Sequence, residues 1–499
     1  MNNILKCIGT LLIAGCFACN DFLDVSADHE IIQKELFETG EGIRVAVNGV
    51  YKSLSSTDLY AYNLTYGFVS AMANNYLAYS STYLPYGLYM AANFEYENSS
   101  VMEIADNIWT KGFNVIANCN NILQEVESKD STFFETGDAE KQMIRGEMYG
   151  IRAMMHFDLL RLFCPSPASG RQGKMPYVER YPEYQPEHIS QNEVMDKIIA
   201  DMETCRQILG KVDTVFCRSW NTSLTGRLRN PSSWMTTPPN TFVSYRGHRM
   251  NYMAATALLA RIYLYKGDME HAFEMASLAY AFTQTPTRWF AWTSTSYQGA
   301  ISMVDYISPK KPEEIYMAFS NTENYTFWTN LVSSSNYYFR MNNMADLFQG
   351  DMDDYRYVGY FNRYDNDNRY VVWQPKTADP LSFGPSQGHL LPVIRLSEIY
   401  HILIEYWLSK GNKDEALKYF TPLRTARGAK AAITALSVDE LKEKLFIDII
   451  RETLTQGQTF FLFKRLNRNI YDGDGWEIIM QPEDWVVPIP DSETAYQLN

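Results

Sequence analysis

Apolar residues recur along most of the chain at the three- and four-residue spacing of an amphipathic helix. Between these stretches the spacing is lost, and Ser, Thr, Asn, Pro and Gly become frequent. The periodic stretches predict a mostly α-helical fold. The expected helices cover residues 43–54, 102–126, 144–163, 194–209, 251–282, 396–408, 413–427 and 438–466.

Two of these stretches share one internal pattern. Each has an apolar pair, a bulky ring, a glycine and two small or apolar residues at identical intervals: Leu259-Ala260, Tyr263, Gly267, Ala272 and Ala279, and then Leu403-Ile404, Trp407, Gly411, Ala416 and Leu423. This pattern is typical of a tetratricopeptide-like helical hairpin. The glycine permits a tight turn, and the small residue lets the second helix pack closely on the first.

The connections between the helical stretches are unusually long. Residues 210–249 are rich in Ser, Thr, Asn and Pro, and residues 283–392 are rich in aromatic residues. Connections of this length indicate loops with a function of their own, or segments that contain small strands. We therefore expect a single domain over 31–499, with helical repeats at about 31–285 and 393–470. An irregular, loop-rich ligand-binding face is expected from an insertion at about 286–392.

Composition narrows the class of function. Hydrophobic residues make up 46% of the 499 residues and charged residues 20%, as in a globular protein. The net charge of −14 argues against nucleic-acid binding, which needs clustered Lys and Arg. Aromatic residues reach 14% of the chain, and many of the tyrosines lie in loop-like segments rather than in the predicted helices.

The cysteines predict neither a disulfide scaffold nor a zinc site. Three of the seven lie within the first 19 residues, and no Cys-x-x-Cys or Cys/His cluster follows. Pairing of Cys205 with Cys217 is left open by the sequence. The acidic segment 348–356 has oxygen ligands for Ca²⁺, but a solvated turn is the favoured interpretation. No metal and no cofactor is predicted.

The first residues have the features of an export signal. Lys6 precedes a short apolar run from Ile8 to Ala14, which is too short to span a bilayer. The small residues that follow lead to Cys16, the expected lipidation site, with Cys19 as the alternative. We expect a lipoprotein signal over 1–19 and a tether over 20–30. An ordinary cleaved signal peptide is the competing interpretation.

The order of several motifs resembles the SusD/RagB family of Bacteroidetes surface lipoproteins. The matching blocks are Asn20–Asp24, Ile151–Phe163, Met175–Val178, Ala254–Asp268, Ile394–Glu405, Gly411–Ala416 and Pro488–Pro490 with Glu493. The resemblance extends over essentially the whole chain. A family segment with Glu, Arg and Asp is altered around Arg451–Arg465, and the usual Asn-Pro-Gly-Tyr ending is absent.

The resemblance implies a location and partners. Family members sit on the outer face of the outer membrane and cap a SusC-type TonB-dependent transporter. They capture oligosaccharide, or in some branches peptide, and pass it inward. Their helical repeats usually face the transporter, and the variable loops form the ligand face. The expected function is therefore nutrient binding by a lipid-anchored protein without catalysis.

Sugar rings stack on aromatic side chains while their hydroxyls need hydrogen-bond partners. The candidate ligand contacts are aromatic residues in three loop-like segments: Tyr76, Tyr79, Tyr83, Tyr86 and Tyr89; Trp289 and Trp292; and Tyr325, Trp328 and Tyr337. For any one of them, packing of the loop onto the scaffold is the simpler alternative. Asn74, Asn75, Asn336 and Arg340 are weaker polar candidates.

Two other functions stay open. Acidic residues such as Asp351, Asp353 and Asp354 would suit an envelope-anchored glycoside hydrolase, although their sequence spacing does not fix the separation of the carboxyl groups. No hydrolase, protease or nucleotide-binding motif occurs in a suitable context. His156 and His401 lie in apolar helices and are expected to be core residues. A tetratricopeptide scaffold that binds only protein is the third possibility.

Overall fold

The structure is a computed structural model. It describes residues 35–221, 226–228, 237–284, 289–294, 310–335, 337–342, 344–361, 388–471, 477–491 and 493. The signal and tether predicted over 1–30 lie outside the described residues, as do Cys16, Cys19 and Asn336.

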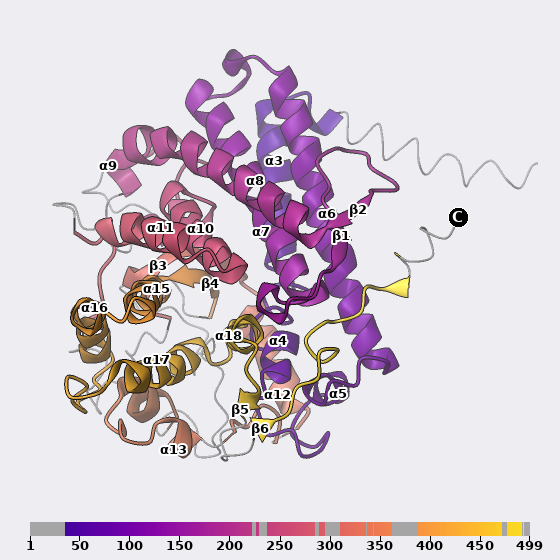
Figure 1. Cartoon of the computed structure of the whole chain (residues 1–499). Helices are drawn as coiled ribbons and strands as arrows, with labels where there is room; N and C mark the ends of the chain where they lie inside the picture. Colours follow the sequence, from indigo (N-terminus) through magenta and orange to yellow (C-terminus); the bar gives the residue numbers. More distant parts are fainter. Residues whose placement is uncertain are drawn as a thin grey trace, which may run out of the picture.

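The described residues are mostly helical, as predicted (Figure 1). The helices are α3 (Gly40–Leu54), α4 (Phe68–Met72), α5 (Tyr86–Ala92), α6 (Ser99–Ser128), α7 (Asp138–Phe163), α8 (Gln191–Lys211), α9 (Arg218–Asn221), α10 (Tyr252–Lys266), α11 (Met269–Ala281), α12 (Asn324–Ser333), α13 (Met344–Leu347), α15 (Leu396–Ser409), α16 (Lys413–Ala426), α17 (Val438–Thr453) and α18 (Thr459–Leu466). The strands are β1 (Lys174–Pro176), β2 (His188–Ser190), β3 (Ile315–Ser320), β4 (Leu390–Arg395), β5 (Ile470–Tyr471) and β6 (Glu477–Ile478).

Local sequence explains where several helices begin and end. Ser190 and Glu193 form a reciprocal capping box at the start of α8, and Ser437 with Glu440 does the same for α17. The long helix α7 starts with acidic residues in its first turn and ends at Phe163, two residues before Pro165. These signals lie beside the predicted apolar stretches, which explains the agreement between expected and observed helices.

Both predicted hairpins are present. The turn between α10 and α11 has Gly267 in the left-handed region at φ 89°, and Gly411 between α15 and α16 has φ 68°. Ala272 and Ala416 are fully buried where the paired helices meet. The two hairpins also pack against each other, with the Phe273 and Tyr406 rings stacked at 3.9 Å. The tetratricopeptide-like arrangement therefore follows from the repeat seen in the sequence.

One predicted helix is interrupted. The stretch 438–466 forms α17 and α18 with a break after Thr453. At the break, Thr455 and Gly457 have φ values of 57° and 70°, which no right-handed helix accommodates. The backbone of Leu64 approaches Gly457 so closely that a Cβ there would lie 1.9 Å from the Leu64 carbonyl oxygen. The break therefore serves a close tertiary contact.

Part of the predicted ligand-face insertion is core. Strand β3 lies inside the segment 286–392, yet it pairs antiparallel with β4, and all but its last residue are buried. Strand β4 is buried along its whole length. Because α10 contacts both strands, this two-stranded sheet lies inside the helical scaffold (Figure 1).

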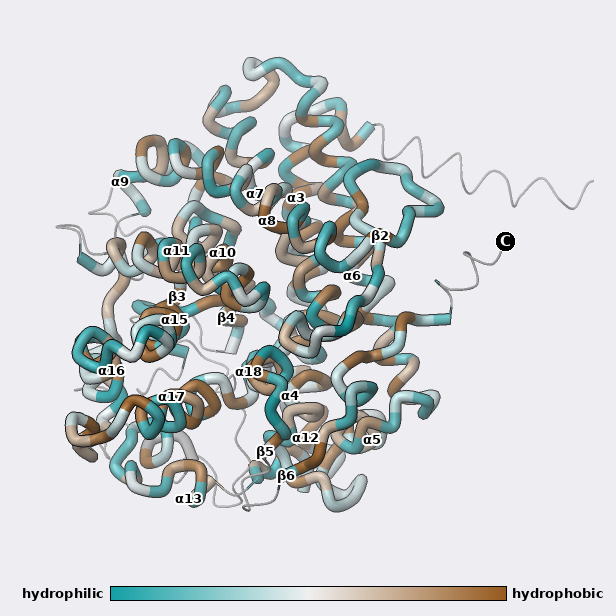
Figure 2. Tube along the Cα trace, viewed as in Figure 1, coloured by the Kyte–Doolittle hydropathy of each residue, from teal (hydrophilic) through white to brown (hydrophobic). Residues whose placement is uncertain are grey.

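One continuous cluster of buried apolar side chains runs from Phe37 to Val487. Hydrophobic residues lie at β3, β4 and the helix faces turned toward them, and hydrophilic residues lie on the outer turns (Figure 2). Within the described part of the chain, no helix combines the length and the apolar character needed to cross a bilayer.

Candidate functional site

Two of the predicted tyrosine segments meet, although more than 230 residues separate them in sequence. Tyr76 forms an antiparallel bridge with Met341. The N–H of Leu77 donates to the carbonyl of Arg340, and the N–H of Phe339 donates to the carbonyl of Tyr83, both at 2.9 Å. Backbone pairing thus fixes the first segment beside the third.

The pairing brings three tyrosines together at the surface, and we call Tyr79, Tyr83 and Tyr337 the tyrosine patch. The Tyr83 ring lies edge-on between the other two, 6.3 Å from each. Tyr79 is 65% exposed and Tyr337 is 48% exposed, while Tyr83 is partly covered. The guanidinium of Arg340 lies over the Tyr337 ring at 4.8 Å. The patch thus offers aromatic faces beside hydroxyls and one cation.

Tyr76 does not belong to this surface, so its predicted role as a ligand contact is wrong. Its side chain is 0% exposed, and its hydroxyl donates to the carbonyl of Tyr66 at 2.6 Å. Burial raises the pKa of the Tyr76 phenol well above its usual range. The ring packs edge-on against Phe339 at 5.2 Å. Tyr76 therefore supports the patch from below.

Trp328 belongs to the same supporting layer. It is half-buried on α12, with its ring 5.6 Å from Tyr66 and 5.3 Å from Phe339. Phe339 itself is buried with a left-handed backbone (φ 60°), a conformation that costs about 1–3 kcal/mol for such a residue. The surrounding rings hold Phe339 there, and its neighbours in sequence reach the surface on either side.

The other tyrosines of these segments lie near the patch or on the adjoining helices. Tyr86 is exposed on α5, and its hydroxyl accepts a hydrogen bond from the amide of Asn98 at 3.2 Å. Tyr89 on the same helix and Tyr325 on α12 are half-buried. These three remain predictions as ligand contacts.

The second predicted aromatic segment does not join the patch. Trp289 is buried, with its ring stacked near Phe282 at 5.8 Å, and its predicted contact with a ligand is wrong for that reason. Trp292 is half-buried, 4.7 Å from the Tyr400 ring and beneath the guanidinium of Arg427 at 4.9 Å. Trp289 therefore has a structural role, and Trp292 remains a prediction as a ligand contact.

The weaker polar candidates also divide into buried residues and residues that reach the surface. Asn74 and Asn75 are buried, and their side chains bind the carbonyl of Ala92 and the N–H of Thr455, each at 3.1 Å. They stabilise the loop rather than face a ligand. Arg340 is half-exposed at the patch and remains a candidate.

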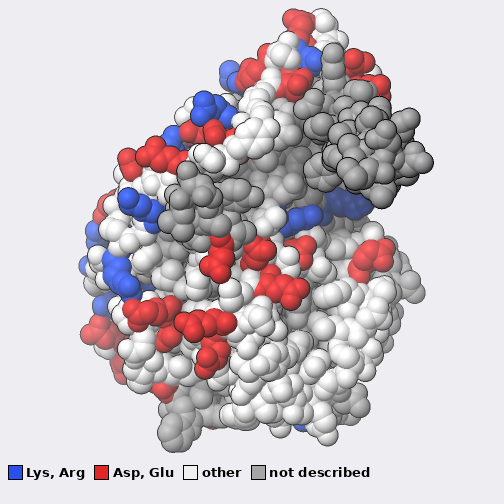
Figure 3. All heavy atoms as spheres, turned by 90° about the vertical axis from the view of Figure 1, so that its right-hand side faces the viewer, with Lys and Arg blue, Asp and Glu red and all other residues white. Residues whose placement is uncertain are grey.

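The surroundings of the patch carry few charges. No charged residue occurs between Asp58 and Glu95, and none occurs between Glu323 and Arg340. The lower part of the face drawn in Figure 3, on the side where α5 lies, shows a broad area without charged side chains. This surface therefore suits an uncharged ligand. The two charge-free stretches are visible in the sequence and point to this surface in addition to the aromatic residues.

The acidic segment around Asp351 is a buried ion-pair network instead of a solvated turn. Asp351 binds Arg424 at 2.6 Å and Arg451 at 2.7 Å, and Asp354 binds Arg356 at 2.7 Å. Although burial opposes ionisation, hydrogen bonds from Arg424 and Arg451 hold the pKa of Asp351 well below its usual range. Among the described residues, no cluster of three or more His, Cys, Asp or Glu side chains could hold a metal ion.

The two histidines predicted to be core residues and the cysteines of the described chain are buried. His156 is buried; its Nδ1 lies 2.9 Å from the Arg152 carbonyl, and its Nε2 accepts from the Val178 N–H at 3.0 Å. Burial lowers the pKa of His156 to about 3. His401 is also buried, with Nε2 at 3.1 Å from Asp448. Cys205 and Cys217, whose pairing the sequence left open, are both free buried thiols.

A cleft that sequence reasoning missed lies between α3, the segment 240–249 and the segment 319–323. Its volume is about 900 Å³. Its aromatic residues, among them Tyr51 and Tyr245, are far apart in sequence and do not cluster as the other tyrosines do. Only the tertiary structure brings them together.

Comparison with known proteins adds a match to a family model over the first part of the chain. Residues 21–219 match the family model SusD-like, described as "Starch-binding associating with outer membrane". No curated protein matches the chain.

Several solved structures share the fold. A SusD-like carbohydrate binding protein from Bacteroides vulgatus is 17% identical, with 92% of this chain and 97% of that chain covered and a TM-score of 0.65. A SusD superfamily protein from Bacteroides thetaiotaomicron is 17% identical over 92% and 98% of the two chains, with a TM-score of 0.66. Another from Bacteroides vulgatus is 19% identical over 92% and 98%, also with a TM-score of 0.66.

At these identities the structures establish a common fold with SusD superfamily proteins. The family model and the order of the motifs agree with it. Residues 21–219 thus match a SusD-like family model, and the described fold is shared with SusD superfamily structures, which agrees with the resemblance seen in the sequence.

Proposed function

We propose that this protein is an outer-membrane lipoprotein that captures neutral oligosaccharides on the tyrosine patch. The observation that carries the proposal is the meeting of Tyr79, Tyr83 and Tyr337 at the surface, with their rings held edge-on to each other. Sugar rings bind aromatic faces through their C–H groups, and nearby hydroxyls satisfy their polar edges. The buried aromatic layer around Phe339 fixes the patch before a ligand arrives, which lowers the entropy cost of binding.

The absence of charge near the patch favours a neutral glycan over a charged peptide. Arg340 is the one charged residue within the two described stretches that form the patch, 76–89 and 337–342. The description of the family as starch-binding and the carbohydrate-binding neighbour point the same way. A peptide is the competing ligand class, and the binding experiments must distinguish it from a glycan.

The glycoside hydrolase alternative loses its best candidates. Asp351 and Asp354 are each paired with arginine in the interior, where a substrate does not reach them. The carboxyl group of Asp351, whose pKa is held low by hydrogen bonds from arginine, is a poor proton donor for glycosidic cleavage. The binding function therefore has the better support.

We further propose that a lipid on Cys16, or alternatively on Cys19, tethers the protein to the outer membrane beside a SusC-type TonB-dependent transporter. The apolar run and small residues ahead of these cysteines support the tether. Mass spectrometry of the mature N-terminus tests it, because an unmodified and freely secreted chain would refute the anchor. Affinity purification from membranes tests the transporter, and recovery without a TonB-dependent barrel would argue against that partner.

Binding is tested by screening neutral oligosaccharides, starting with maltoheptaose, and titrating the retained glycan by calorimetry. We expect Tyr79→Ala and Tyr337→Ala each to weaken binding about two- to tenfold, because one lost aromatic contact is worth about 0.5–1.5 kcal/mol. Tyr184→Ala is the matched control, since Tyr184 is 84% exposed and lies outside the patch. Unchanged affinity in both patch variants would refute the site, and capture of peptides alone would refute the ligand class.

A further inference from the structure

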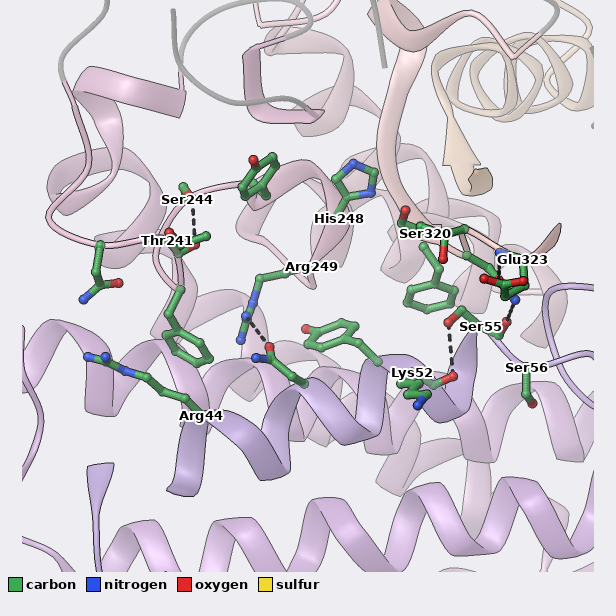
Figure 4. Close-up of a pocket in the computed structure, with 18 of the residues that line it drawn as sticks. Arg44, Lys52, Ser55, Ser56, Thr241, Ser244, His248, Arg249, Ser320 and Glu323 are labelled. Atoms are coloured by element: carbon green, nitrogen blue, oxygen red, sulfur yellow. Dashed lines mark hydrogen bonds between the residues drawn. The ribbon is translucent and has the colours of Figure 1, made fainter. Parts of the chain in front are cut away.

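The cleft between α3, the segment 240–249 and the segment 319–323 has the form of a second binding site. Helix α3 forms its floor, with Arg44 toward one end and Lys52 and Ser55 toward the other (Figure 4). The segment carrying Thr241 and Arg249 lies above the floor, and the turn after β3 closes one side. The cleft volume of about 900 Å³ falls in the range of small-ligand sites.

The lining alternates aromatic rings with neutral hydrogen-bonding groups, as a sugar requires. The rings are Tyr51, Phe242, Tyr245 and Phe319. The neutral polar residues include Asn48, Asn240, Thr241, Ser320 and Asn321, and the charged residues besides the two arginines are Glu41, Lys52 and Glu323. This combination of donors, acceptors and apolar faces matches the hydroxyls and C–H faces of a neutral oligosaccharide.

The two arginines of the lining are already neutralised. Arg44 binds Glu140 at 2.7 Å and Arg249 binds Glu147 at 2.8 Å, and both carboxylates are buried. An anionic ligand would therefore find little uncompensated positive charge from these groups. Their role is to hold the walls. The other charged lining residues are of mixed sign, one cation at Lys52 and two anions at Glu41 and Glu323, so the lining as a whole favours an uncharged ligand.

The aromatic walls are fixed in advance. The Phe242 ring lies under the guanidinium of Arg249 at 4.1 Å and near that of Arg44 at 5.5 Å. The Tyr51 hydroxyl donates to Glu147 at 2.9 Å and accepts from the N–H of Met250 at 3.0 Å. Because these rings are already ordered, ligand binding costs less entropy.

Tyr245 is held at the cleft in a strained conformation. Its φ of 52° and ψ of 38° place a bulky residue in the left-handed region. The next residue, Arg246, is buried and bonded to Asp213 at 2.7 Å and also to Glu147, so the interior holds the turn in place. Tyr245 stays half-exposed and lines the cleft. Strain of this kind at a cleft is typical of ligand sites.

We propose that this cleft is a second binding site for a neutral oligosaccharide, separate from the tyrosine patch. The inference rests on the proposed glycan-binding function, and it adds a place where a further part of the glycan, or a second molecule, binds.

The test blocks the cleft with a bulky side chain placed on α3, the helix that forms its floor. Asn48 is exposed on α3 and lines the cleft, so Asn48→Trp fills the site without disturbing the core. Val45→Trp is the matched control, because Val45 is 52% exposed on the same helix and does not line the cleft. Both changes are made in the mature chain that also carries Tyr79→Ala and Tyr337→Ala. Equal melting temperatures confirm that the variants fold.

Calorimetry and amide hydrogen exchange are then measured with the neutral oligosaccharide that the wild type retains, starting with maltoheptaose. We expect the patch variant to keep residual binding, with slowed exchange in residues 240–250 and in α3. Asn48→Trp should weaken this residual binding at least about tenfold and remove the protection, whereas Val45→Trp should leave both unchanged.

Two results would overturn the inference and leave the proposed function standing. One is complete loss of binding in the patch variant, with protection in the wild type confined to the neighbourhood of Tyr79 and Tyr337. The other is residual binding that Asn48→Trp does not weaken. If the wild type retains no oligosaccharide at all, the proposed function fails, and this inference fails with it.

Discussion

Arg427 joins the helical scaffold to the segment before β3, and its removal should destabilise the fold strongly. Its guanidinium is fully buried and donates to Glu314 at 2.7 and 3.0 Å and to Glu452 at 2.7 and 2.8 Å. Glu452 also binds Arg356 at 2.9 Å, so it keeps a cationic partner when Arg427 is lost. Glu314 would lose its two-pronged ion pair and keep the N–H of Thr293 at 3.1 Å.

The expected loss in the free energy of unfolding follows from this difference, because Glu452 keeps a cationic partner and Glu314 loses its ion pair. Arg427→Met keeps the apolar stem but leaves the carboxylate of Glu314 poorly compensated in the interior. Breaking a buried ion pair on one side costs about 3–5 kcal/mol. Adding Glu314→Gln removes the uncompensated charge, so the double variant should recover about 1–3 kcal/mol relative to the sum of the two single variants. Urea unfolding of the mature chain, followed by circular dichroism, measures the free energy of unfolding for each variant.

Arg468→Met is the matched control. Arg468 makes a similar two-pronged pair with Glu443 at 3.0 and 3.1 Å, but this pair lies at the surface. The same change there should cost less than about 1 kcal/mol. Equal costs for the two arginine variants, or strictly additive costs for Arg427→Met and Glu314→Gln, would refute the reasoning from burial.

Three further predictions concern stability and reactivity. Burial lowers the pKa of His156 to about 3, below the value of about 6.5 in the unfolded chain, so protons bind the unfolded state first as the pH falls. Wild-type stability should therefore lose about 2 kcal/mol more than His156→Gln between about pH 7 and pH 5, and equal losses in urea titrations would contradict this. Gly49→Ala should raise stability by about 0.5–1 kcal/mol, because a Cβ at this position in α3 meets no atom within 4 Å. Gly411→Ala should lower stability by about 1 kcal/mol because of its φ of 68°, and thermal unfolding that ranks the two variants in the opposite order would refute the comparison. The four cysteines of the described chain are buried thiols, so a thiol reagent should label them only after unfolding; rapid labelling of the native protein would be inconsistent with their burial.

Much of the helical scaffold could be predicted because its signals are local. The pattern with Gly267 and Ala272 in one hairpin, and Gly411 and Ala416 in the other, fixes a turn and a close helix contact within about 30 residues of chain. The break near Gly457 could not be predicted in the same way. It depends on the approach of Leu64, almost 400 residues earlier, and helical periodicity carries no information about such a contact.

The candidate site was predictable as a set of segments but not residue by residue. Tyr76 and Tyr79 look alike in sequence, yet one is buried beneath Phe339 and the other is largely exposed. Trp289 also looked suitable, but its ring is buried against the scaffold near Phe282. An aromatic side chain packs a core as readily as it stacks on a sugar, so residue type alone does not separate the two roles.

The sequence by itself determined the helical hairpins, the resemblance to the SusD/RagB family and the loops in which a ligand site was to be sought. These depend on periodicity, caps and turns, which are properties of neighbouring residues. The tertiary structure alone decided that Tyr79 and Tyr83 meet Tyr337, and that α3 meets the segment 240–249 to form a cleft. Both arrangements depend on contacts between segments far apart along the chain. Such contacts form through packing and backbone pairing, which leave no local pattern in the sequence.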